Sequence, residues 1–99
     1  MPLMTSPPHD LIHTLSTGPK IAPKVTDVRR DMGTRILLKR QSKGLSQSDV
    51  AAKMDLSDAA ISMWEKGKTE PSIAKFIHLA NILGTTPEYL AFGIEFRRQ

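Results

Sequence analysis

Three times between residues 44 and 86, a glycine that can end a helix is followed within five positions by a hydroxyl residue that can begin another. The pairs are Gly44 with Ser46, Gly67 with Ser72, and Gly84 with Thr86. Glycine takes the left-handed conformation that closes many helices, and a serine or threonine oxygen accepts a hydrogen bond from a free N–H group at a helix start. No stretch shows the sustained alternation of apolar and polar residues that a half-buried strand requires. The sequence therefore predicts an all-α fold of short helices.

Apolar residues at helical spacing between these signals predict five helices, the first over residues 26–44 and the last over residues 87–92. Ser46 and Asp49 form a carboxylate variant of the capping box at the start of the second helix. Proline at the first position of the last helix, after Thr86, is a further start signal. The expected buried residues are Val28, Met32 and Ile36 in the first helix, Val50, Ala51 and Met54 in the second, Ala60, Ile61 and Trp64 in the third, and Ile73, Phe76, Ile77, Ala80 and Leu83 in the fourth.

Only three residues, beginning with Asp55, separate the second helix from the third. Aspartate tolerates the left-handed conformation better than most residues, so we expect Asp55 to have the positive φ of this turn and Ser57 to cap the third helix. Ala51 is small enough for the two helices to meet, while Ile61 and Trp64 anchor the third helix in the core. Helices joined in this way can lie one across a phosphate backbone and the other in the major groove of DNA.

The beginning of the chain differs in composition from the rest, because five of the seven prolines lie there. Their fixed φ angles and missing N–H donors prevent a continuous helix or a central strand. We therefore expect a disordered N-terminal tail over residues 1–25, a helical domain over residues 26–93 and a C-terminal extension over residues 94–99. Asp10–Leu15 has amphipathic spacing but is too short for a stable isolated helix, so we expect it to order only on a partner.

Composition excludes several functional classes. With 99 residues and no cysteine, the chain has room for one small domain without disulfides, and its net charge of +4 favours polyanionic partners. Its apolar runs fall short of the roughly 20 residues of a membrane span, and its start lacks the apolar core of a signal peptide, so we expect a soluble, cytoplasmic protein. No strand-borne phosphate loop, cysteine nucleophile or recognisable Ser/His/Asp order is present, so we expect no enzymatic activity, no cofactor, no metal site and no small-molecule substrate.

An ordered set of residues from about Thr26 to Gly93 resembles the lambda-repressor-like, Cro-type helix-turn-helix family, which includes the xenobiotic-response-element regulators and phage repressors. The matching residues are Met32-Gly33-Thr34-Arg35-Ile36, Arg40, Gly44-Leu45-Ser46-Gln47, Val50-Ala51, Ile61-Ser62, Trp64-Glu65-Lys66-Gly67, Pro71-Ser72, Leu79-Ala80, Leu83-Gly84 and Tyr89-Leu90. The resemblance implies a compact five-helix domain that binds double-stranded DNA, usually as a dimer, and regulates transcription.

The resemblance also implies roles for polar residues. Gln47 matches a glutamine that contacts a phosphate at a helix start, where free N–H groups favour an anion. Arg40 and Glu65 match an interior ion pair between the first helix and the end of the recognition helix. Lys66 and Lys68 match loop positions that hold the phosphate backbone without reading sequence. The phosphate-contact candidates are Ser46, Gln47, Lys66, Lys68 and Thr69, and the candidate residues of an N-terminal arm, if the tail is more than a linker, are Lys20 and Lys24.

The family places its base-reading residues on the exposed start of the third helix. The candidates here are Ser57, Asp58, Ala59, Ser62 and Met63. They depart from the glutamine, arginine or asparagine common in the family, so we expect modest direct readout, with help from DNA shape. Asp58 can accept a hydrogen bond from cytosine N4, and Ala59 or Met63 can pack on a thymine methyl group. Basic residues of the first helix could contact phosphate or form a solvated face; they are Arg29, Arg30 and Arg35.

The C-terminal residues are too apolar for a free chain end, which indicates self-association or docking to a partner protein. The candidate dimer-interface residues are Leu90, Phe92, Ile94 and Phe96. We therefore predict a sequence-specific transcriptional regulator, most simply a phage- or prophage-type repressor that binds a palindromic operator as a homodimer. The alternative is an antitoxin-like or coactivator-like protein-binding module of the same fold. Salt separates the two, because DNA binding weakens steeply with salt and apolar docking hardly changes.

Overall fold

The structure, a computed structural model, describes residues 24–94, and in this part of the chain every regular element is a helix. The helices are α2 (Val25–Ser42), α3 (Gln47–Met54), α4 (Asp58–Glu65), α5 (Ile73–Ile82) and α6 (Pro87–Phe92). The predicted all-α fold is therefore confirmed for these residues. The tail segment Asp10–Leu15 lies outside them. None of the described helices is long and apolar enough to cross a membrane.

A hydroxyl side chain at the start of each of the last four helices accepts a hydrogen bond from the N–H group three positions later. These caps are Ser46, Ser57, Ser72 and Thr86. At Ser46 the predicted capping box is complete: the Ser46 N–H donates to Asp49 Oδ2 over 2.8 Å, and Ser46 Oγ accepts from the Asp49 N–H over 2.9 Å. Because such bonds satisfy donors that a helix start leaves unpaired, each helix begins where its cap lies.

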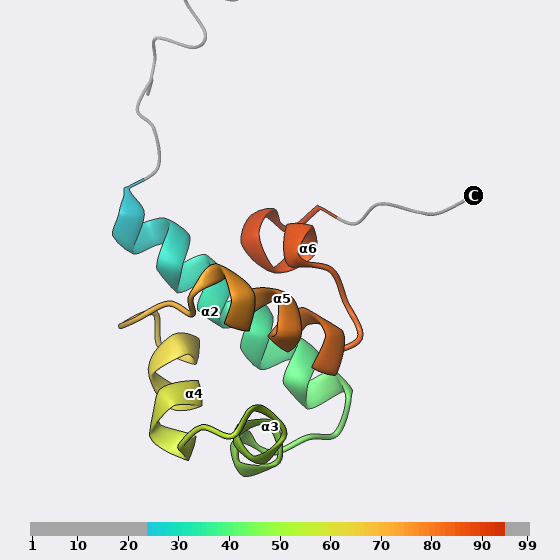
Figure 1. The fold of residues 1–99 in the computed structure, drawn as a ribbon. Helices are drawn as coiled ribbons and strands as arrows, with labels where there is room; N and C mark the ends of the chain where they lie inside the picture. The colour runs from blue at the N-terminus through green and yellow to red at the C-terminus, as the bar shows by residue number, and fades with distance from the viewer. Residues whose placement is uncertain (1–23, 95–99) are drawn as a thin grey trace, which may run out of the picture.

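The long helix α2 crosses the molecule diagonally in Figure 1, with α6 on one side of it and α3 and α4 on the other. Both α4 and α6 pack directly on α2, while α3 packs on α4 and α5. One core takes side chains from all five helices: Met32, Ile36, Val50, Ala51, Ile61, Trp64, Leu79, Ala80, Leu83 and Leu90. Each fully buried leucine or isoleucine in it stabilises the fold by about 1.5–3 kcal/mol.

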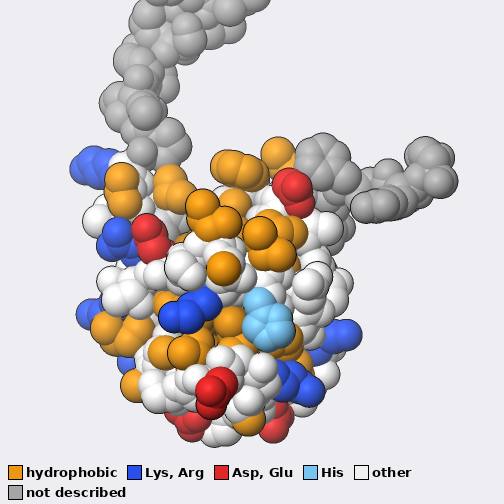
Figure 2. All heavy atoms as spheres, in the orientation of Figure 1, with side chains coloured by type: hydrophobic (Ala, Val, Ile, Leu, Met, Phe, Trp, Pro, Cys, Tyr) orange, Lys and Arg blue, Asp and Glu red, His pale blue; other side chains and the backbone are white. Residues whose placement is uncertain are grey.

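Three residues that we expected in the core lie on the surface instead. The exposed fractions are 43% for Val28, 47% for Ile77 and 79% for Ile73, whereas Leu79, which we had not placed in the core, is fully buried. Because α5 has apolar residues on more than one side, its periodicity did not show which side would meet the core. Hydrophobic side chains are consequently visible on the surface over α5 and α6 (Figure 2).

Candidate nucleic-acid interface

The turn between α3 and α4 fixes the angle between these two helices. Asp55 has φ 58° and ψ 45°, and it is the one non-glycine residue of positive φ within residues 24–94. The prediction for Asp55 is therefore confirmed. The Leu56 N–H donates to the Ala51 carbonyl over 2.9 Å, which closes α3, and Ala51 itself is 2% exposed where the helices meet. The turn is thus held by its own backbone bonds and by the close packing beneath it.

At the crossing of α4 and α2, the two backbones approach so closely that α2 has no room for a side chain. A Cβ atom at Gly33 would lie 2.4 Å from the Trp64 carbonyl oxygen and 2.6 Å from that of Glu65. Just beyond α4, a Cβ at Gly67 would lie 2.8 Å from the Cα of Arg30, and the φ of Gly67 is +74°. We did not predict the role of Gly33, although a glycine inside a helix is a recognisable sign of close packing.

The expected ion pair between Arg40 and Glu65 is present and is largely buried, with side-chain exposures of 11% and 5%. Arg40 Nε donates to Glu65 Oε2 over 2.6 Å, and Arg40 Nη2 donates to Oε1 over 3.1 Å. A third nitrogen, Nη1, donates to the Leu45 carbonyl over 2.9 Å. The hydrogen bond to Glu65 raises the pKa of Arg40 above its ordinary value. This network ties the end of α4 to α2 and to the residues before α3.

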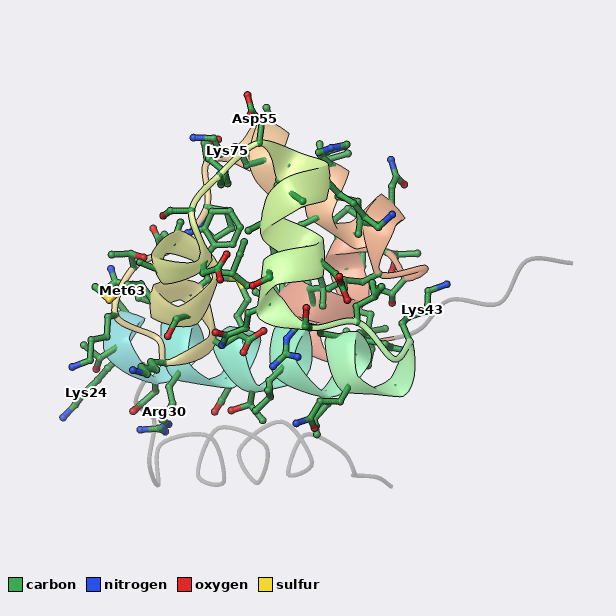
Figure 3. The ribbon with its side chains drawn as sticks, turned by 90° about the horizontal axis from the view of Figure 1, so that it is seen from below. Lys24, Arg30, Lys43, Asp55, Met63 and Lys75 are labelled. Carbon is green, nitrogen blue, oxygen red and sulfur yellow. The ribbon has the colours of Figure 1, made fainter. Side chains whose placement is uncertain are left out.

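The side of α4 that faces away from α2 is open to solvent. Asp58 and Ala59 are exposed, Met63 is 37% exposed, and Ser62 is half-buried. Seen from below, Met63 lies at the edge of the molecule and points outward (Figure 3). The structure therefore leaves these four candidate base readers on the surface.

Two base-reading candidates also form hydrogen bonds within the protein. Ser57 Oγ accepts from the Ala60 N–H over 3.2 Å as the cap of α4, and Ser48 Oγ donates to Asp58 Oδ2. The second bond links the first turns of α3 and α4, and sequence reasoning did not foresee it. One carboxylate oxygen of Asp58 is therefore held toward α3.

The phosphate-contact candidates lie at the start of α3 and in the loop after α4. The exposed ones are Ser46, Lys66, Lys68 and Thr69. Gln47 is half-buried, and its Nε2 donates to Glu65 Oε1 over 2.9 Å. Because an amide nitrogen carries two hydrogens, the second can still donate to a phosphate.

A basic corner forms where the loop after α4 passes the start of α2. Lys66 and Lys68 flank Gly67, which lies against the backbone of Arg30. The Arg30 side chain is 63% exposed and contacts Asp27 over 3.2 Å. Figure 3 shows Lys24 and Arg30 on the same side of the molecule as Met63. Lys20, the other candidate arm residue, lies outside the described residues.

Arg29 and Arg35, the other two arginines of α2 whose role the sequence left open, contact residues outside α2. Arg29 Nε donates to Glu70 Oε1 over 3.1 Å. Arg35 Nη1 donates to the carbonyl of Leu90 over 3.0 Å and to that of Ala91 over 3.3 Å, which caps the end of α6. Among the described residues, Arg30 pairs only with aspartates of its own helix, and its side chain is 63% exposed against 27% for Arg29, so its guanidinium is the more open of the two to solvent.

The prediction that Leu90 belongs to a dimer interface is wrong. Leu90 is fully buried in the core of a single chain, because α6 turns this side chain toward α2 and α5. Phe92 and Ile94 remain available, with exposed fractions of 68% and 49%. Phe96 lies outside the described residues. Of these apolar residues, Leu90 thus belongs to the core, whereas Phe92 and Ile94 lie on the surface.

Comparison with known proteins identifies relatives of this helical region. A sequence model of the helix-turn-helix family matches residues 36–90, which is more than half of the chain. Repressor protein C2 of Salmonella phage P22 is 34% identical over 62 residues, or 63% of this chain and 29% of that protein. The HTH-type transcriptional regulator DicA of Escherichia coli is 30% identical over 64 residues, or 65% of this chain and 47% of that protein. The matched part thus spans less than half the length of either relative.

Two solved structures have the same arrangement of helices. The P22 c2 repressor, crystallised in complex with a synthetic operator, gives a TM-score of 0.61 at 33% identity, covering 64% of this chain and 96% of that one. The restriction-modification controller protein C.AhdI of Aeromonas hydrophila gives a TM-score of 0.58 at 30% identity, covering 62% of this chain and 92% of that one.

Proposed function

Because this chain belongs to the helix-turn-helix family, we propose that it is a transcriptional regulator that binds double-stranded operator DNA with α4 in the major groove. In its finer form, the proposal is a phage-type repressor that acts in the cytoplasm as a homodimer on a palindromic operator. One observation carries it: α4 is fixed to the core along one side and open to solvent along the other. The P22 relative is a repressor whose solved complex contains an operator, which supports the proposal.

A recognition helix must reach DNA in a fixed position, because ordering it upon binding would weaken the complex. Here the close approach at Gly33, the Arg40–Glu65 ion pair and the turn at Asp55 hold α4 at three points. The outer face can then enter a groove without rearrangement of the helix.

Phosphate contacts come from two places on either side of α4. The start of α3 offers free N–H groups and the second amide hydrogen of Gln47, and a helix N-terminus favours an anion. The basic corner offers Lys66, Lys68 and Arg30. These contacts orient the protein on the duplex and make its affinity depend on salt.

Base readout in this proposal is partly apolar. Ala59 and Met63 present methyl groups that fit thymine C5-methyl groups in the major groove. Asp58 has one oxygen engaged by Ser48, so its other oxygen would accept a hydrogen bond from cytosine N4. We infer a half-site in which thymine and cytosine, rather than guanine, are the bases read directly by α4.

The first test is selection of duplex DNA from a random pool, followed by titration of the selected site at several salt concentrations. Lys68→Ala should lower affinity on all sequences alike and reduce the slope of log affinity against log salt by about one. Lys43→Ala is the matched control, because Lys43 lies at the end of the molecule opposite Met63 (Figure 3). If the slope of log affinity against log salt is the same for the wild type and both variants, Lys68 does not contact a phosphate.

The second test replaces single thymines of the selected half-site by deoxyuridine, which lacks only the methyl group. Loss of one methyl contact should weaken wild-type binding by about 0.8 kcal/mol, or roughly fourfold. The Met63→Ala variant should bind more weakly overall, and at the thymine that Met63 contacts its affinity should no longer depend on the methyl group. Equal sensitivity of the wild type and the variant at every thymine would remove Met63 from the set of readers.

The dimer is tested separately at Phe92 and Ile94. Two-fold symmetry requires half-sites about 10 base pairs apart, or a multiple of that spacing. Phe92→Asp should give monomers in sedimentation experiments and weak operator binding, whereas a variant that remains dimeric would move the interface elsewhere. If no duplex binds at low salt while Phe92 and Ile94 still mediate association with another protein, the result would favour the alternative, a protein-binding module of the same fold.

A further inference from the structure

Four exposed apolar side chains at the start of α2 and on α5 take no part in the proposed DNA contacts or in the proposed dimer. Val25 and Val28 lie on the first turns of α2 with exposed fractions of 65% and 43%, and Ile73 and Ile77 lie on α5 with 79% and 47%. We call these four residues the α2–α5 face. Figure 2 shows hydrophobic side chains gathered over α5 and over the beginning of α2, on the side of the molecule that faces the viewer.

Two contacts bring the parts of this face together. The ion pair between Arg29 and Glu70, 3.1 Å long, joins the second turn of α2 to the residues just before α5. The backbone of Gly67 lies against Arg30, so the loop that leads into α5 follows the same turn of α2. Val25 and Val28 are three positions apart on one side of their helix, and Ile73 and Ile77 are four apart on theirs. The fold therefore holds the start of α2, with Val25 and Val28, near the start of α5, where Ile73 lies.

A surface of this kind is usually covered, because soluble proteins rarely leave large, contiguous apolar side chains in water. The chain itself supplies a candidate cover. Residues 1–23 precede α2, and they join it at Lys24, directly beside Val25. Within them, Asp10–Leu15 carries Leu11, Ile12 and Leu15 at spacings that put all three on one side of a helical turn.

The connecting chain is long enough for this segment to return to the face. Nine residue steps separate Leu15 from Lys24, and they can span up to about 30 Å when extended. The way to the face is shorter: Arg29 is five residues from Lys24, or about 8 Å along α2, and it pairs with Glu70, three residues before Ile73. A segment tethered by a short linker meets its site at an effective concentration in the millimolar range, far above that of a second molecule in dilute solution.

We propose that Asp10–Leu15 docks on the α2–α5 face of its own chain, with Leu11, Ile12 and Leu15 placed against Ile73 and Ile77. The contact is apolar and intramolecular. It does not depend on DNA binding, and it leaves Phe92 and Ile94 free for the dimer. Lys20 lies between the docked segment and α2, so docking would also hold this lysine close to Lys24.

The test is photocrosslinking of the full-length protein with Leu15→p-benzoylphenylalanine, followed by mapping of the crosslinked peptides by mass spectrometry. We expect crosslinks to residues 73–77 within one chain, at a yield that does not change on dilution. An equal mixture of isotopically light and heavy protein identifies the partner. Crosslinks between light and heavy chains would overturn the proposal in favour of a second copy, and crosslinks that avoid α5 would overturn it altogether.

Surface variants supply the matched controls. Ile73→Ser with Ile77→Ser should abolish the crosslink, whereas Leu38→Ser should leave it intact, because Leu38 is also exposed, at 53%, but lies on the later turns of α2. An unchanged crosslink in the Ile73 and Ile77 double variant would contradict the proposal. Trp64 fluorescence shows that each variant is folded. Operator affinity is not a readout here, so failure of this proposal leaves the proposed function standing.

Discussion

On one side α4 presents Ile61, Trp64 and Glu65 to the rest of the protein, and on the other it presents Ala59 and Met63 to solvent. Contacts within the protein determine which residues fit on the inner side, because Ile61 is buried and both carboxylate oxygens of Glu65 accept hydrogen bonds from Arg40. The outer side must fit only what lies outside the protein. The fold therefore separates the placement of α4 from the choice of the residues that we propose to read bases. Changes on the two sides should affect different measurements.

The largest effect should follow from Arg40→Met, which removes the partner of a buried carboxylate. Glu65 would then lose its cationic partner in a site where its side chain is 5% exposed, and losing one member of such a pair typically costs about 3–5 kcal/mol of unfolding free energy. Urea denaturation measures this directly. Arg30→Met is the matched control, because the Arg30 side chain is 63% exposed and its pair should contribute less than about 1 kcal/mol. Similar losses of unfolding free energy in both variants would mean that the buried ion pair stabilises the protein no more than the exposed one.

The next largest effect should follow from Gly33→Ala, where the sign of the change in stability is itself informative. Alanine favours a helix interior over glycine by about 1 kcal/mol, so an uncrowded site would gain stability. With a carbonyl oxygen 2.4 Å from the new Cβ, α4 must move, and we expect a net loss of about 1–3 kcal/mol together with weaker operator binding.

The control for Gly33 is Gly44→Ala. A Cβ at Gly44 would meet nothing within 4 Å, but the residue has a φ of +73°. The Gly44→Ala variant should lose about 1–2 kcal/mol of unfolding free energy through backbone strain alone. Because α4 would stay in place, its operator affinity should not change under folding conditions. A stability gain in Gly33→Ala would show that α2 and α4 can separate at no cost.

Features set by one or two neighbouring residues could be predicted from the sequence. Ser46, Ser57 and Asp55 do what their local chemistry favours, because a cap or a left-handed turn needs no distant partner. The Arg40–Glu65 pair joins residues far apart in sequence, and only the resemblance to a family suggested it.

Features that depend on which surfaces meet could not be predicted in this way. Periodicity marked α5 as apolar but could not choose between the side with Leu79 and the side with Ile73. The sequence placed Leu90 in an apolar surface cluster, but α6 packs against the core and buries this side chain. The bond from Ser48 to Asp58 likewise exists only because the turn brings the two helix starts together. In each case the missing information is a contact between elements.

Asp55→Gly tests the turn that sets the direction of the outer face. Glycine adopts the left-handed conformation of Asp55 without steric cost, so the variant should gain up to about 1 kcal/mol in unfolding free energy. Asp55→Ala should lose stability at the same position, because alanine tolerates this conformation less well. Thermal melts of the two variants measure both shifts. A clear fall in melting temperature for Asp55→Gly would mean that the aspartate side chain itself stabilises the turn.

The smallest expected effect is a pH dependence at the start of α3, beside the outer face. Hydrogen bonds from the Ser46 N–H and the Ser46 hydroxyl hold the pKa of Asp49 below its usual value. A carboxyl group whose pKa is lower in the folded state stabilises the fold above its unfolded pKa of about 3.9, and this contribution disappears as pH falls through the lower, folded value. The melting-temperature difference between the wild type and Asp49→Asn should therefore be constant near neutral pH and shrink as the solution becomes more acidic than about pH 4. A difference that stays the same throughout this acid range would show that the carboxylate charge of Asp49 contributes nothing to the cap, and that the amide of asparagine replaces it in full.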